Sequence, residues 1–93
     1  MKRELVNTPR FDRDARRWGK MHPQTMHTIR ATLLQLSEDA FHPSLDSHKL
    51  KGALAPYRAC SAGFDIRIVF EVIAHNGAEA IRLIGLGTHD DVY

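Results

Sequence analysis

The chain has 93 residues, of which 43% are hydrophobic; this fits one small globular domain and excludes a disordered chain. The formal net charge is only +2, so total charge identifies no partner. The cations are clustered, however, and a clustered charge favours an anionic partner, either a nucleic acid or an acidic protein. The cluster comprises Arg10, Arg13, Arg16, Arg17 and Lys20.

The first half of the chain predicts a short strand and a helical hairpin. Residues 4–8 form the strand, and Thr8 followed by Pro9 is typical of a helix start. Helical periodicity then runs over 10–20, and residues 19–23 are expected to end this helix. A second helix is expected from Pro23 to about 37–40. Its predicted buried stripe is Met26, Ile29, Leu33 and Leu36, widened by Leu34.

The second half predicts three strands. Residues 41–56 are irregular, with Leu50 and Leu54 as expected apolar anchors. Strands follow over 57–61, 65–73 and 79–86, and the last of these is the most apolar and is expected to be central. Asn76-Gly77 between the last two is a strong hairpin signal.

These elements predict a single α+β domain over residues 1–93, in which an N-terminal strand and a helical hairpin pack on an antiparallel sheet. The helix pair would cover one sheet face, and the other face could carry a site. The single cysteine, Cys60, excludes an intrachain disulfide and is expected to be a buried apolar residue. We find no signal peptide and no membrane-spanning run, so a cytoplasmic location is expected.

Six histidines invite a metal hypothesis, but their spacing matches no metal motif, so neither a metal nor another cofactor is predicted. Two histidines stand apart, because His48 precedes the strand region and His89 follows the last strand. A histidine beside a strand end can be held rigidly and can exchange a proton near neutral pH. Either one alone is more often an ordinary surface residue. We interpret His22, His27, His42 and His75 as surface or loop residues.

Three further residues each allow two readings. Arg67 interrupts an apolar strand, where it either pairs with Glu71 or presents its planar fork to a phosphate. Asp65 either caps a turn or orients a histidine. Tyr93 either packs on the core, or stacks on a base or donates its hydroxyl.

Together the chain resembles the RelE/ParE toxin superfamily and, within it, the YafQ-like branch. The resemblance rests on the amphipathic helix pair, His48-Lys49-Leu50-Lys51-Gly52, Tyr57-Arg58-Ala59-Cys60, the strand from Asp65, and Gly87-Thr88-His89 with an aromatic four residues after the histidine. It implies a RelE-like microbial-RNase-type fold. It also implies a type II toxin that cleaves mRNA on the ribosome without a metal and is neutralised by a cognate antitoxin.

The resemblance also implies site residues. His48, Asp65, His89 and Tyr93 match the YafQ-like histidines, acid and terminal aromatic, and Arg67 matches a phosphate-binding arginine of RelE-type toxins. RNA-binding roles fall on Lys49, Lys51, Arg58 and Ser61. Ser61 stands where the YafQ-like pattern has a further histidine, and Ile66 stands where it has an aromatic.

Two other functions remain open. A ParE-like chain of the same fold would inhibit DNA gyrase without cutting RNA, because fold does not fix function. A degenerate member would only bind its antitoxin. The basic surface over residues 10–20 and around Lys49 could accept an acidic antitoxin segment that folds on binding.

Overall fold

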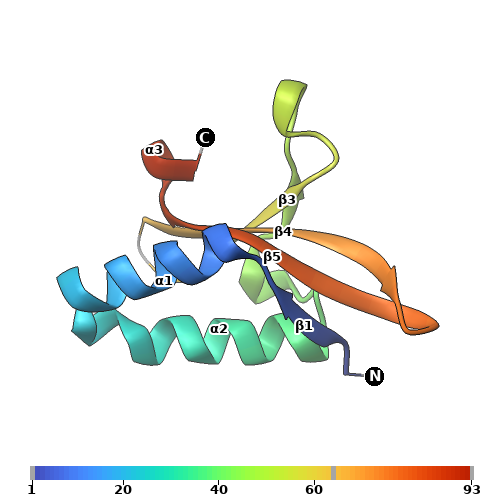
Figure 1. Cartoon of the computed structure of the whole chain (residues 1–93), viewed down its shortest axis with the longest axis horizontal. Helices are drawn as coiled ribbons and strands as arrows, with labels where there is room; N and C mark the ends of the chain where they lie inside the picture. The colour runs from blue at the N-terminus through green and yellow to red at the C-terminus, as the bar shows by residue number, and fades with distance from the viewer. Residues whose placement is uncertain (1, 64, 93) are drawn as a thin grey trace.

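The computed structural model describes residues 2–63 and 65–92, and its strands form one five-stranded sheet in the order β1-β5-β4-β3-β2 (Figure 1). The strands are β1 Glu4–Asn7, β2 His48–Lys49, β3 Arg58–Ser61, β4 Ile66–His75 and β5 Ala78–Thr88. The α-helices are α1 Pro9–Met21, α2 Met26–Glu38 and α3 His89–Val92. Three 3₁₀ turns complete the elements: η1 Pro23–Thr25, η2 Pro43–Leu45 and η3 Gly52–Leu54. The predicted α+β class is confirmed.

The start of α1 confirms the predicted cap. Thr8 Oγ1 accepts a hydrogen bond from the Phe11 N–H at 3.2 Å and donates one to the Leu83 carbonyl at 2.8 Å. The cap therefore also fastens the helix start to β5. The helix ends at Met21, within the predicted range 19–23, and it continues through Gly19 because one glycine costs a helix only about 1 kcal/mol. The second helix begins at Met26 after the turn η1, and not at Pro23.

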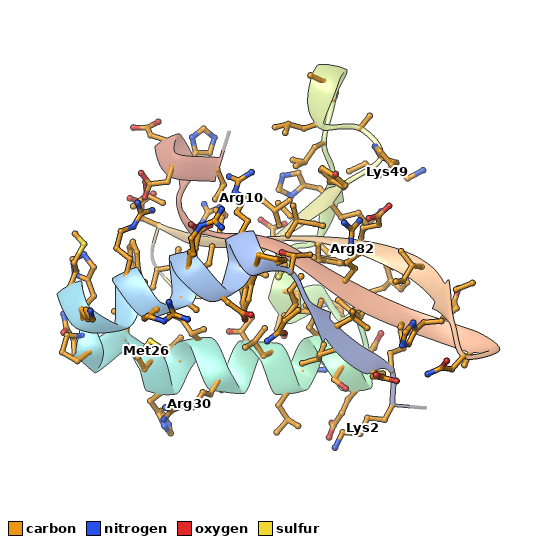
Figure 2. All side chains as sticks on the ribbon, in the orientation of Figure 1. Lys2, Arg10, Met26, Arg30, Lys49 and Arg82 are labelled. Atoms are coloured by element: carbon orange, nitrogen blue, oxygen red, sulfur yellow. The ribbon has the colours of Figure 1, made fainter. Side chains whose placement is uncertain are left out.

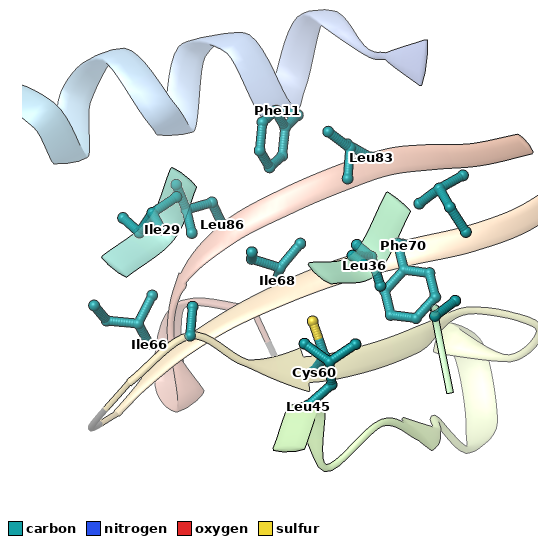
Figure 3. Packing of buried hydrophobic residues seen from close by; sticks show 13 residues of the cluster. Phe11, Ile29, Leu36, Leu45, Cys60, Ile66, Ile68, Phe70, Leu83 and Leu86 are labelled. Carbon is teal, nitrogen blue, oxygen red and sulfur yellow. The ribbon is translucent and has the colours of Figure 1, made fainter. Parts of the chain in front are cut away.

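The main core lies between the sheet and the helix pair (Figure 3). Phe70, Ile68 and Leu86 from the sheet meet Ile29 and Leu36 from α2, and all five are essentially buried. Burial of such side chains from water is the main term that stabilises the fold. Cys60 lies in this cluster, as expected, and burial raises the pKa of its thiol to about 12.

The predicted buried stripe of the second helix is wrong at one position. Leu34 is 53% exposed, and Thr32 is buried in α2 instead. Thr32 tolerates burial because its hydroxyl donates to the Thr28 carbonyl at 2.9 Å. In the irregular segment Leu45 is buried, and the predicted anchors Leu50 and Leu54 are half-buried, with Leu50 packed against a second apolar cluster.

The sheet is mixed and not purely antiparallel. Strands β3, β4 and β5 form the predicted meander, and Asn76 and Gly77 both have positive φ in the hairpin turn, at 53° and 80°. However, β1 pairs in parallel with β5, from Glu4 opposite Ala80 to Asn7 opposite Leu83. The prediction missed β2, because two residues are too few to show alternation. The central position belongs to β4, while β5 lies between β1 and β4.

The two sheet faces are covered unequally. Helices α1 and α2 lie on one side, here called the covered face, whereas α3 and the segment between β2 and β3 rise on the other (Figure 1). That second side, the open face, carries a small apolar cluster of Ala59, Val69 and Ile84, on which Val92 of α3 packs. Leu50 and Tyr57 border this cluster.

Candidate functional site

Two rows of paired residues cross the open face. The first row is His48 opposite Ala59, Ala59 opposite Val69, and Val69 opposite Gly85. The second row is Ser61 opposite Arg67 and Arg67 opposite Gly87. Directly paired residues share a face, and alternate residues of one strand also share it. The two rows therefore lie on the same face, about 6.5 Å apart along the strands.

The second row ends where α3 folds back onto the sheet. A Cβ atom on Gly87 would lie 2.7 Å from the Cβ of Asp91, so only glycine allows this approach. The Thr88 hydroxyl accepts from the Asp91 N–H at 3.2 Å, and Asp91 Oδ2 accepts from the Thr88 N–H at 3.0 Å. This reciprocal pair is a capping box. The Gly87-Thr88-His89 motif thus closes the sheet and places His89 as the first residue of α3.

The electrostatics of α3 follow from this cap. The hydrogen bond from the Thr88 backbone, followed by that with the Thr88 hydroxyl, lowers the pKa of the Asp91 carboxyl. The positive charge of Arg17 contributes in the same direction. His89 itself is exposed, with 58% of its side chain accessible and Nδ1 3.6 Å from Asp90 Oδ1. An ion pair with Asp90 requires the protonated imidazole.

His48 lies at the opposite end of the first row, in the edge strand β2. Its Nδ1 is 3.1 Å from the Asp46 carbonyl oxygen. A backbone carbonyl only accepts, so this contact favours the tautomer with the proton on Nδ1 and makes Nε2 the acceptor nitrogen of the neutral ring. The same exposed ring thereby gains a defined orientation.

Arg67 is half-buried on the open face, and Nη1 donates to the Ile66 carbonyl at 3.1 Å. The alternative partner, Glu71, accepts from Arg82 at 2.8 Å instead. This arrangement removes the proposed Arg67–Glu71 pair and leaves the Arg67 guanidinium on the face that also holds Ser61. A planar guanidinium on a rigid strand suits a phosphate group.

The other predicted residues are not all gathered here. Arg58 pairs with Lys49 on one side and with Phe70 on the other. Because Phe70 is buried on the covered face, Arg58 points to that face as well. Its Nε donates to Ser47 Oγ at 3.0 Å, and its guanidinium stands 5.0 Å from the centre of the Phe41 ring. Lys49 shares that row and is exposed.

Two predicted residues lie in loops, and one cannot be placed. Lys51 is exposed and precedes the turn η3. Asp65 is exposed immediately before β4, with a positive φ of 60°. Tyr93 lies outside the described residues.

Two side chains near this face were not predicted to belong to the site. Strand β1 ends opposite Leu83, so it does not pair with the rest of the β5 edge. Helix α1 borders this part of β5, and Asp14 Oδ2 accepts a hydrogen bond from the Leu86 N–H there at 3.1 Å. Arg10 lies beside Asp14, with Nε 3.7 Å from Oδ2. The available signal was Gly85, since an isolated glycine in an apolar strand often marks a close approach by other groups.

Within residues 2–63 and 65–92, no group of three or more His, Cys, Asp or Glu side chains could hold a metal ion. None of the helices in that part of the chain is long and apolar enough to cross a membrane.

The mixed sheet, the helix pair on one face and the short C-terminal helix form the fold of the RelE/YafQ-like toxins. The family model described as bacterial toxin of type II toxin-antitoxin system, YafQ, matches residues 3–93. The chain therefore belongs to this family of type II toxins.

Solved structures show the same fold. YafQ from E. coli strain BL21(DE3) superposes with a TM-score of 0.79 at 16% identity, covering 99% of each chain. A YoeB/ParE toxin from Agrobacterium tumefaciens gives 0.76 at 20% identity, covering 92% of this chain and 98% of the other. The E. coli DinJ-YafQ toxin-antitoxin complex gives 0.77 at 17% identity, with 100% and 99% covered. None of the curated proteins matches the sequence.

Proposed function

We propose that this toxin is a ribosome-dependent endoribonuclease that cleaves mRNA by general acid and base catalysis. The observation that supports this most strongly is that His48 and Arg67 share the open face, while the capped end of β5 places His89 beside it. Family membership supports the class of toxin. The chemical roles are inferred from the residues themselves.

The proposed reaction uses the 2′-hydroxyl of the RNA as its nucleophile. Nε2 of neutral His48 removes the hydroxyl proton, and the 2′-oxygen forms a bond to the adjacent phosphorus. Arg67 binds the phosphate oxygens as their negative charge increases in the transition state. Protonated His89 then gives its proton to the 5′-oxygen as the bond from phosphorus to that oxygen breaks. One proton is taken and one is returned, so the site needs no other reactant.

The contacts support this division of the two histidine roles. The bond between His48 Nδ1 and the Asp46 carbonyl favours the tautomer that a base requires. The nearby Asp90 carboxylate can pair with His89 only when the imidazole carries the proton that an acid requires. Asp65 is proposed to orient a histidine and Tyr93 to stack on or hydrogen-bond the substrate. Ser61, beside Arg67, and the exposed Lys51 are proposed to bind the RNA strand, with Lys49 and Arg58 supporting from the row that faces the covered side.

The direct test is cleavage of mRNA on programmed ribosomes by His89→Ala, read by primer extension. Loss of a proton-transfer group should slow cleavage by about 10²- to 10⁴-fold. His75→Ala is a matched control, because His75 is the last residue of β4, about 26 Å along the strand from Arg67, and its Nε2 lies 3.7 Å from Glu4 Oε2. Cleavage by His89→Ala at the wild-type rate would refute the assignment. Gyrase inhibition by a wild-type chain that leaves RNA intact would instead support the ParE-like alternative.

We further propose a cognate antitoxin as the protein partner. A YafQ from E. coli is seen in a toxin-antitoxin complex with DinJ, and the exposed arginines of α1 offer a basic surface for an acidic segment. Co-expression with its cognate antitoxin should yield a co-purifying complex that does not cleave mRNA. Full cleavage by such a mixture would argue against neutralisation by that partner.

A further inference from the structure

We propose that Arg10 is a second phosphate-binding residue of the open face, and this inference rests on the proposed cleavage of RNA. It would hold the phosphate next to the one bound by Arg67. Neither the superfamily resemblance nor the sequence pattern assigned Arg10 to the site.

The first observation is the place of the Arg10 guanidinium. Gly85 pairs with Val69, so a side chain on Gly85 would point to the open face. A Cβ placed there would lie 3.5 Å from both Cζ and Nε of Arg10. The guanidinium of Arg10 therefore occupies the space above Gly85, although Arg10 itself belongs to α1. Figure 2 shows Arg10 directed past β5 toward the side of α3.

The second observation is how the side chain is held. Asp14 is largely buried, with 16% of its side chain exposed, and its Oδ2 accepts from the Leu86 N–H. The same oxygen lies 3.7 Å from Arg10 Nε, and Oδ1 lies 3.7 Å from Arg17 Nη2. The hydrogen bond to β5 thus holds Asp14 in place, and its single negative charge lies between two arginines. The surplus positive charge remains beside the open face, where 51% of the Arg10 side chain is exposed.

The third observation is the spacing. Arg10 lies over Gly85, and Arg67 pairs with Gly87 in the next row. The two rows lie about 6.5 Å apart along the strands, and neighbouring strands lie about 4.8 Å apart, so two long arginine side chains at these positions can reach successive phosphates of a single RNA strand. An RNA whose scissile phosphate is bound by Arg67 would therefore present a neighbouring phosphate to Arg10. Such contacts set the register of a nucleic acid without reading its bases.

The test combines a protein variant with a neutralised phosphate. Single-turnover cleavage is measured on ribosomes programmed with synthetic mRNAs, each carrying one uncharged methylphosphonate beside the scissile bond. Arg10→Ala should slow cleavage of unmodified mRNA about tenfold, as expected for one lost charged contact. Arg30→Ala is the control, because Arg30 is exposed on α2 and points away from the sheet (Figure 2). It should cleave within about twofold of wild type.

The uncharged phosphate shows whether Arg10→Ala acts through a lost contact with the mRNA or through another change in the protein. At one flanking position the methylphosphonate should slow wild type about tenfold and slow Arg10→Ala no further, because the two changes remove the same contact. Arg10→Lys should recover part of the rate by restoring the charge. Additive losses at every position, or an Arg10→Ala rate equal to that of Arg30→Ala, would overturn the Arg10 inference alone. A wild-type chain that cleaves none of the mRNAs would overturn the proposed function and this inference together.

Discussion

The two faces of the sheet are built from the same strands but from different kinds of residue. On the covered face, large side chains such as Ile68, Phe70 and Leu86 are buried under two helices. On the open face, the rows hold Ala59, Gly85 and Gly87 beside His48 and Arg67. Neighbours along a strand point to opposite faces. Within one strand, alternate residues therefore either stabilise the core or belong to the candidate site. The two glycines on the open face allow groups from the helices to approach the sheet: Asp91 of α3 lies over Gly87, and Arg10 of α1 lies over Gly85.

The largest expected effect tests this division through β4. Phe70→Ala should destabilise the fold by about 3–5 kcal/mol, because it removes a fully buried aromatic side chain. Arg67→Ala, three residues away on the open face, should keep most of the stability and lose about 10²-fold or more in mRNA cleavage. Urea unfolding and ribosome cleavage assays measure the two quantities. Equal destabilisation by both substitutions would break the comparison between the faces.

A smaller effect is expected where the open face meets α3. Gly87→Ala places a methyl group 2.7 Å from the Asp91 Cβ, so α3 must shift and carry His89 with it. A misplacement of about 1 Å can cost on the order of 10²-fold in rate, and cleavage should fall accordingly while the core persists. Gly19→Ala is the control, since its Cβ would lie 3.5 Å from Met26 Sδ, an ordinary contact. Wild-type cleavage by Gly87→Ala would show that the position of α3 does not matter.

The smallest expected effect concerns the pH dependence of the α3 cap. The pKa of Asp91 is lower in the folded chain because the ionised carboxylate accepts hydrogen bonds from Thr88. Its stabilising contribution is therefore fully present above the unfolded pKa and is lost as pH falls through the folded pKa. Thermal unfolding of wild type and Asp91→Asn should differ at neutral pH and converge in acid. A difference that stays constant with pH would exclude this linkage.

Much of the fold was predictable because its signals are local. The cap at Thr8 and Pro9, the helix periodicity and the Asn76-Gly77 turn each act within a few residues. The errors arose where long-range contacts decide. The parallel pairing of β1, the two-residue strand β2 and the exchange of Leu34 for Thr32 in the buried stripe depend on which segments meet in space.

The site was partly predictable for the same reason. His48, Arg67 and His89 could be selected because strand ends and a charge within an apolar strand are visible in sequence. The orientation of Arg58 toward Phe41 was not visible, because it depends on the register of three strands. Arg10 was hidden among other arginines of an exposed helix face. Only the pairing of Gly85 and the bond between Asp14 and Leu86 reveal its place.

The parallel pairing of β1 with β5 has a consequence for synthesis. Glu4 pairs with Ala80, so β1 cannot form its sheet hydrogen bonds until β5, the last strand of the sheet, has been synthesised. Contacts between such distant segments form late, since closing a long loop costs entropy before any contact compensates for it. His89 lies beyond that last strand. A nascent chain therefore lacks both its finished sheet and His89 until β5 and α3 have been synthesised and have folded onto the rest of the domain.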